Sequence, residues 1–159
     1  MKKMIRSAWK GCPVALLVMT LLFSCIAGAE TLTETENPFR TMIMEALTDG
    51  ESLQEMFPDD LTDLLGIEPE EYTDALWLMG SGLDGREVLV IRAVDEKAAE
   101  GIMERMAAYL EQRRKETRNY FPEAYQLLTA TEIVQKNELL ILIVGENAQA
   151  EIDALVAEK

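Results

Sequence analysis

The 159-residue sequence contains no histidine and only two cysteines, Cys12 and Cys25. Residues 26–159 therefore have neither an imidazole nor a thiol. These absences exclude Ser-His-Asp triads, cysteine nucleophiles and histidine or thiolate metal sites from that part of the chain. No recognisable catalytic motif takes their place. We therefore expect a non-catalytic protein, with no catalytic, cofactor-binding or metal-binding residues to assign and no cofactor.

Basic residues are also scarce, with 15 Lys and Arg against 29 Asp and Glu. Residues 1–29 contain four of the basic residues and no acidic one, so residues 30–159 keep 11 basic and 29 acidic groups, a net charge of −18. A surface this negative repels nucleic-acid phosphates and anionic lipid headgroups. We expect no nucleic-acid partner, and membrane contact only through an N-terminal lipid anchor. The expected partner is a protein or small ligand of unknown identity.

A hydrophobic run long enough to span a membrane is missing as well. The longest one, residues 13–23, is about half of the roughly 20 residues that a spanning helix needs. It follows the basic residues Lys2, Lys3, Arg6 and Lys10 and precedes small residues, which is the pattern of a secretory signal peptide.

Two processing sites stay open. Cleavage after Ala29 removes a signal peptide of residues 1–29 and releases a soluble protein. The stretch Leu22-Phe23-Ser24-Cys25 instead resembles a lipobox, and cleavage there removes residues 1–24 and leaves a lipidated Cys25. Both outcomes predict an exported protein, either extracellular or attached to the outer side of the cytoplasmic membrane.

Beyond the signal, residues 30–36 are polar and acidic and are predicted to form a tether, and residues 37–159 a single α+β domain. Asn37 supplies an N-cap, and Pro38 follows at the first position of a short helix that ends by Gly50.

Periodicity predicts four strands and three further helices after this short one. Val88–Ile91 and Leu139–Val144 have apolar residues on both faces, so their strands are expected to be central. Asp95 caps the longest helix. The predicted strands cover residues 72–81, 86–94, 130–135 and 138–144, and the predicted helices cover 95–117, 123–128 and 146–158.

The order of these elements gives two ββα units. We predict a four-stranded antiparallel sheet with helices packed on one face, preceded by the short N-terminal helix. Placing the two apolar strands in the centre gives the spatial order first, second, fourth, third, with the first strand at an edge. A Gly82-Leu-Asp-Gly85 turn joins the first hairpin, and Lys136-Asn137 turns the second. Trp77 is interpreted as a core residue rather than a ligand platform.

Acidic residues crowd the segment from Glu51 to Asp74, where calcium binding is the specific hypothesis. The segment lacks the alternating ligands, central glycine and distal glutamate of a calcium loop. A cation-dependent binding module therefore stays as one alternative function. A hydrolase using Asp59/Asp60 or Glu70/Glu71 is another, although sequence neighbours rarely face a common substrate. The interleaved apolar residues are expected in the core: Leu61, Leu64, Leu65 and Ile67.

The predicted helix 95–117 ends in a cluster of basic residues, from Arg113 to Arg118. Positive charge at a helix C-terminus is stabilised by the helix dipole. Binding of an anion, or of the acidic N-terminal half of the protein, is the alternative. The predicted solvent face includes Glu111 and Lys115, which are spaced for an i,i+4 ion pair, and also Glu100, Glu104, Arg105, Arg113 and Arg114.

Several ordered features resemble an exported bacterial family, domain of unknown function 4358. They are Gly66-Ile67, Glu70-Glu71-Tyr72, Glu87 before an apolar strand, Asp95 opening a long helix, Tyr120 and Pro122, Lys136-Asn137, and the final apolar strand. The resemblance covers about residues 64–157. It departs from the family at Lys136-Asn137-Glu138, where many members have a glycine beside the asparagine. The resemblance implies export, often as a lipoprotein, and supplies no catalytic residues.

Together these features favour an exported, acidic, non-catalytic domain of the bacterial cell envelope or extracellular space that binds another molecule.

Overall fold

The computed structural model of the chain describes residues 37–80 and 85–157. The predicted signal peptide, Cys25, the cleavage site after Ala29, the tether at 30–36 and most of the first hairpin turn lie outside the described residues. The described part forms a mixed α+β domain, as predicted. None of its helices is long and apolar enough to cross a membrane.

The sheet of the described residues has five antiparallel strands in the order β1-β2-β3-β5-β4. The strands are β1 (Gln54–Glu55), β2 (Tyr72–Met79), β3 (Glu87–Ala93), β4 (Ile133–Lys136) and β5 (Leu139–Val144). The predicted order of the last four is confirmed, whereas the predicted number of strands is wrong. The additional strand β1 has only two exposed residues, which offer no alternating pattern to recognise. It pairs with Met79 and Leu78, so β2 is not the edge strand.

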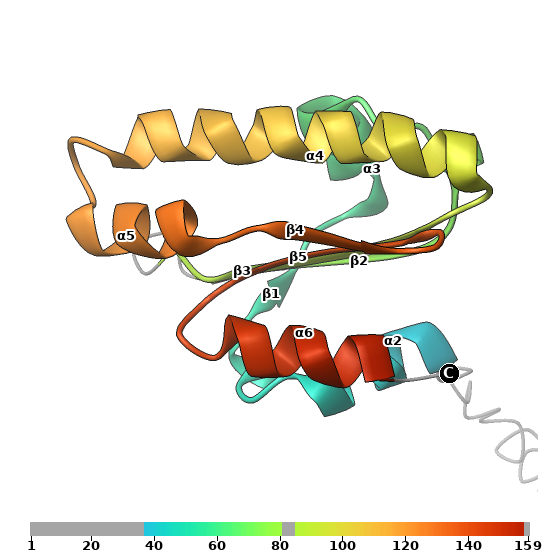
Figure 1. Cartoon of the computed structure of the whole chain (residues 1–159), viewed down its shortest axis with the longest axis horizontal. Helices are drawn as coiled ribbons and strands as arrows, with labels where there is room; N and C mark the ends of the chain where they lie inside the picture. The colour runs from blue at the N-terminus through green and yellow to red at the C-terminus, as the bar shows by residue number, and fades with distance from the viewer. Residues whose placement is uncertain (1–36, 81–84, 158–159) are drawn as a thin grey trace, which may run out of the picture. The chain divides into compact units, whose positions relative to one another are not determined.

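Helices cover both faces of this sheet, and the prediction of one covered face is wrong. Helix α4 (Glu96–Thr117) lies on one face, and helices α2 (Pro38–Ala46) and α6 (Ala148–Ala157) lie on the other (Figure 1). Because β3 and β5 are apolar on both faces, each face must be covered. Leu89 and Ile91 pack in the core under α4, and Val88 and Val90 in the core with α2 and α6.

The predicted helix starts are largely confirmed by their caps. The Asn37 Oδ1 accepts a hydrogen bond from the Phe39 N–H at 2.9 Å, and the Asp95 Oδ1 accepts one from the Ala98 N–H at 2.7 Å. Three helices differ in their bounds from the predictions. Helix α2 ends at Ala46, α5 extends over Pro122–Ala130, and α6 begins at Ala148 rather than at Glu146. Between α2 and β2 the chain forms 3₁₀ turns at Gly50–Ser52 and Pro69–Glu71, helix α3 (Pro58–Asp60) and a π turn at Leu61–Leu65.

The core assignments hold with one exception. Trp77 is 3% exposed, as expected of a core residue, and Leu61, Leu65 and Ile67 are buried. Leu64 is 59% exposed, because it lies on the outer side of the π turn whose inner side carries Leu61 and Leu65. In the second hairpin, Asn137 has the positive φ of 54° that its turn requires.

Candidate functional site

Two adjacent residues at the start of β3 each form an enclosed ion pair. Arg86 precedes the strand, Glu87 is its first residue, and their partners are Glu151 in α6 and Arg113 in α4. Of the ion pairs formed by the described residues, these two have the most buried acidic partners. Because side chains alternate along a strand, Arg86 and Glu87 point to opposite faces of the sheet.

Glu87 is fully shielded from solvent and is the centre of a buried polar cluster. Its Oε1 accepts hydrogen bonds from Trp77 Nε1 at 2.8 Å and from the Tyr109 hydroxyl at 2.7 Å. Its Oε2 lies 3.6 Å from Nε of Arg113, an ion-pair distance too long for a hydrogen bond. The rings of Trp77 and Tyr109 meet edge to face with centroids 5.6 Å apart. The cluster therefore links β2, β3 and α4.

Burial raises the pKa of the Glu87 carboxyl, while the hydrogen bond from Tyr109 and the charge of Arg113 oppose that rise. Burial likewise raises the pKa of the Tyr109 hydroxyl, and the neighbouring Glu87 adds to the effect. Raised carboxyl pKa values are frequent at catalytic sites. Glu87, however, has no exposed surface through which a substrate could reach it. Its geometry therefore suits a structural link between the strands and α4.

Glu151 forms the corresponding link on the opposite face. It is 2% exposed, and its Oε1 accepts hydrogen bonds from Arg86 Nη2 at 2.9 Å and from the Thr48 N–H at 3.0 Å. These contacts join α6 to the start of β3 and to the segment that follows α2. The Oε2 of Glu151 makes no hydrogen bond to any described residue.

Beside this ion pair lies a pocket of about 530 Å³. Arg86 contributes the one basic side chain of its described lining. The other described residues come from the segment after α2, from α5 and from the connection between β5 and α6: Asp49, Glu123, Gln126, Leu127, Gly145, Glu146 and Asn147. The lining thus combines three carboxylates and two amides with one guanidinium. Such a surface can bind a cation and offer one anchoring contact to a carbonyl or carboxylate.

Gly145 makes room for the Arg86 guanidinium. A Cβ atom at this position would lie 2.3 Å from Arg86 Nη1, well inside van der Waals contact. Glycine at the end of β5 therefore allows the guanidinium to pass close to the backbone, between the pocket and Glu151.

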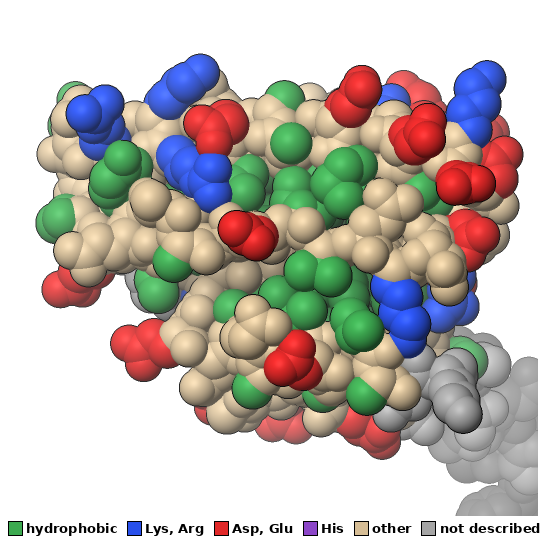
Figure 2. Space-filling model, viewed as in Figure 1, with side chains coloured by type: hydrophobic (Ala, Val, Ile, Leu, Met, Phe, Trp, Pro, Cys, Tyr) green, Lys and Arg blue, Asp and Glu red, His purple; other side chains and the backbone are tan. Residues whose placement is uncertain are grey.

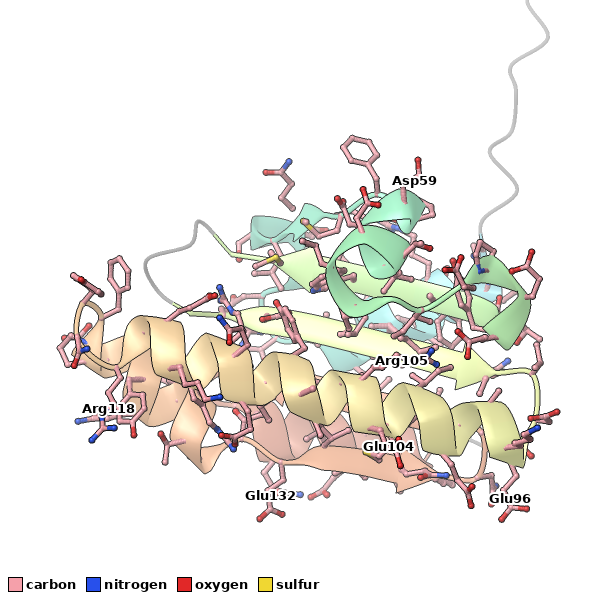
Figure 3. All side chains as sticks on the ribbon, turned by 90° about the horizontal axis from the view of Figure 1, so that it is seen from above. Asp59, Glu96, Glu104, Arg105, Arg118 and Glu132 are labelled. Carbon is pink, nitrogen blue, oxygen red and sulfur yellow. The ribbon has the colours of Figure 1, made fainter. Side chains whose placement is uncertain are left out.

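The acidic residues singled out in the sequence, Asp59/Asp60 and Glu70/Glu71, do not act as pairs at a common site. The Asp60 Oδ2 accepts a hydrogen bond from the Phe57 N–H at 2.8 Å, so it caps a turn. Glu71 accepts one from the Glu68 N–H at 2.9 Å and one from Arg105 at 2.6 Å, and both lower the pKa of its carboxyl. Asp59 points away from α3 (Figure 3). Within residues 37–80 and 85–157, no group of three or more metal-ligating side chains is placed to hold a metal ion.

Two residues of the basic cluster are not on a solvent face, contrary to prediction. Arg113 reaches Glu87, and Arg114 donates to the backbone carbonyls of Leu128 at 2.8 Å and Thr131 at 2.7 Å. Arg114 also pairs with Glu111, in place of the predicted Glu111–Lys115 pair. Arg105, likewise predicted to face solvent, is half-buried against Glu71. A guanidinium has five donors on a long stem, so Arg114 can donate to both of these carbonyls at once.

The sequence analysis did not identify the roles of Glu87, Tyr109 and Glu151, although the sequence carries a signal for the two glutamates. Glu87 shares the face of Leu89 and Ile91 by strand alternation, and Glu151 lies within the apolar stripe of α6 beside Ile152. A charged residue inside an apolar pattern must find a buried partner.

Residues 46–145 match the model of a protein family described as Domain of unknown function (DUF4358). This range covers more than half of the chain and agrees with the resemblance found over the ordered motifs. Comparisons with curated proteins and with solved structures gave no significant match.

Proposed function

The chain belongs to the DUF4358 family, and for this member we propose an exported, non-catalytic domain that binds a cationic ligand in the pocket beside Arg86. The composition supports the non-catalytic part, because residues 26–159 contain no histidine or cysteine. The basic, apolar and small-residue pattern of residues 1–29 supports export.

The lining of the pocket carries the proposal. Asp49, Glu123 and Glu146 place three negative charges around it, against the single positive charge of Arg86. Arg86 is held by Glu151, so the guanidinium is already oriented before a ligand arrives. A peptide with lysine or arginine side chains fits both features. Its cations meet the carboxylates, and its backbone carbonyls accept from Arg86.

Isothermal titration with trilysine tests the binding proposal, with triglutamate as the ligand control. We expect measurable binding of trilysine and none of triglutamate. The double variant Glu123→Gln/Glu146→Gln should weaken trilysine binding by about tenfold, since each rim charge contributes on the order of 0.5–1 kcal/mol.

A matched control separates the pocket from the general acidity of the protein. The double variant Glu100→Gln/Glu104→Gln removes two exposed charges from α4, which does not line the pocket. Its trilysine affinity should stay close to that of the wild type. Equal weakening by both double variants, or no binding of trilysine, overturns the pocket as the binding site.

Export is tested by the intact mass of the protein isolated from cells. The expected species starts at Glu30 or at a lipidated Cys25, and the two masses separate release from membrane anchoring. A mass that retains residues 1–24 contradicts the proposal.

A further inference from the structure

Strand β4 forms one edge of the sheet, and part of its backbone is directed away from the protein. The Ala93 N–H donates to the Glu138 carbonyl at 2.8 Å, which fixes the alternation of hydrogen bonds between β3 and β5. By that alternation, Leu139 and Ile141 direct their backbone groups towards β4.

The residues opposite Leu139 and Ile141 are Lys136 and Val134, which therefore use their backbone groups within the sheet. Ile133 and Gln135 direct theirs outwards. Among the described residues, no further backbone hydrogen bond reaches either of them. The edge thus offers two N–H and two C=O groups in the geometry of a strand.

Both ends of this open stretch are closed by side chains. Arg114 donates to the Thr131 carbonyl at 2.7 Å, and the Gln135 side chain donates to the Asn137 carbonyl at 3.0 Å. Only the backbone from Ile133 to Gln135 is left for pairing. A partner strand of about five residues is therefore the complement of this edge.

Apolar side chains flank the open backbone. Val134 and Ile152 line a groove of about 340 Å³ beside β4, and Ile133 is half-buried on the side of α4. Figure 2 shows hydrophobic side chains gathered on this face both between α4 and β4 and between β4 and α6. A strand added at β4 would cover part of both groups.

We propose that the occupant is β4 of a second copy of this chain, paired antiparallel about a two-fold axis at Val134. In this register Ile133 forms a hydrogen-bonded pair with Gln135 of the second copy, and the reverse pair forms as well. Val134 then faces Val134, and Glu132 faces Lys136 of the second copy on both sides of the axis. The sequence Glu132-Ile-Val-Gln-Lys136 is thus complementary to itself.

The ion pairs select this register over its neighbours. A shift of the pairing by two residues sets Glu132 opposite Val134 or opposite Glu138, and both ion pairs are lost. Glu132 points away from the edge of the sheet (Figure 3), where a second copy can meet it. Lys136 also donates to the Val156 carbonyl, and its ammonium has three donors in all.

Cysteine cross-linking of the full-length chain tests the pairing, with Cys12 and Cys25 replaced by serine. Val134→Cys places two thiols in a non-hydrogen-bonded pair with Cα atoms about 4.5 Å apart, within the range of a disulfide. Two cysteines at position 132 are offset by four residues, roughly 13 Å, and cannot join. After mild oxidation, Val134→Cys should give at least about tenfold more disulfide-linked dimer than Glu132→Cys. Equal yields, or no dimer at position 134, overturn the proposal.

A charge-exchange experiment tests the register without a cysteine. Glu132→Lys alone sets lysine opposite lysine, and Lys136→Glu alone sets glutamate opposite glutamate. Mixing the two variants restores both ion pairs in a heterodimer. Co-expressed full-length chains with different tags should therefore co-purify about tenfold better as the Glu132→Lys and Lys136→Glu pair than as either variant with itself. Equal co-purification of all three combinations overturns the proposed register.

Discussion

Arg86 and Glu87 are adjacent in the chain, yet each forms an enclosed ion pair on a different face of the sheet. Arg86 Nη2 lies 2.9 Å from Oε1 of Glu151 in α6, and Glu87 Oε2 lies 3.6 Å from Nε of Arg113 in α4. One dipeptide at the start of β3 thus connects the sheet to the helices above and below it. Buried charges are costly without partners, so each of these residues depends on the opposite charge.

The Glu87 cluster should be sensitive to loss of its carboxyl. Glu87→Ala leaves Arg113 without its counter-charge and removes the acceptor of both Trp77 and Tyr109. We expect the free energy of unfolding to fall by about 3–5 kcal/mol. Glu87→Gln keeps an acceptor oxygen and should cost only about 1–2 kcal/mol. Urea denaturation measures both changes.

The exposed residue Glu100 in α4 supplies the control for this comparison. Glu100→Ala should change the free energy of unfolding by about 0.5 kcal/mol or less. Equal stability of the Glu87→Ala and Glu100→Ala variants would show that the buried cluster does not stabilise the fold.

The stability contributed by Glu87 should also depend on pH. Burial raises the pKa of its carboxyl in the folded state above the ordinary value of 4.5. The folded state therefore holds this proton more tightly than the unfolded state, and the contribution is complete below pH 4.5. It is lost as the pH rises through the folded-state pKa. The wild type should lose stability relative to Glu87→Gln as the pH is raised from 4.5, and an opposite slope of this difference would contradict the inference.

The sequence was most informative where a pattern extended over many residues. The apolar runs at Val88–Ile91 and Leu139–Val144 predicted the central strands, and Asp95 predicted the start of α4. The same runs, apolar on both faces, favour two covered faces, whereas the ββα order favours one. The strand β1 was missed because two exposed polar residues do not show a period.

The site was harder to predict, because its charged residues come from distant segments. Glu87 and Arg113 are 26 positions apart, and Arg86 and Glu151 are 65 apart. Neither pair has the short spacing that marks an ion pair on a helix. Each acid could be recognised only as an interruption of an apolar face, and its partner could be identified only once the sheet order was known.

The Arg86–Glu151 pair should show strong coupling in a double-mutant cycle. Glu151 is 2% exposed, and Arg86→Ala leaves its buried carboxylate without a counter-charge. Glu151→Ala removes the acceptor of Arg86 and of the Thr48 N–H. Each variant should lose about 3–5 kcal/mol of unfolding free energy. The double variant should be more stable than the sum of the two losses predicts, with a coupling energy of about 1–3 kcal/mol. Additive losses in urea denaturation would show that the two side chains do not interact energetically.

Gly145 provides a last test, because its lack of a side chain is tied to Arg86. In Gly145→Ala the new Cβ would lie 2.3 Å from Arg86 Nη1, so the guanidinium must move and its bond to Glu151 is weakened. We expect a loss of about 1–3 kcal/mol in the free energy of unfolding. Gly101→Ala is the matched control, since its Cβ meets only Arg105 at 3.5 Å within α4, and it should stabilise the protein by about 0.5–1 kcal/mol.

The Arg86→Ala background distinguishes this clash from any other cost at position 145. In this background the Arg86 side-chain atoms that lie closest to the new methyl group of Gly145→Ala, Nη1, Cζ and Cγ, are absent. The substitution should then cost less than about 0.5 kcal/mol. If Gly145→Ala costs the same in both backgrounds, the backbone at the end of β5 requires glycine for its own conformation, and the close approach of Arg86 is not the reason.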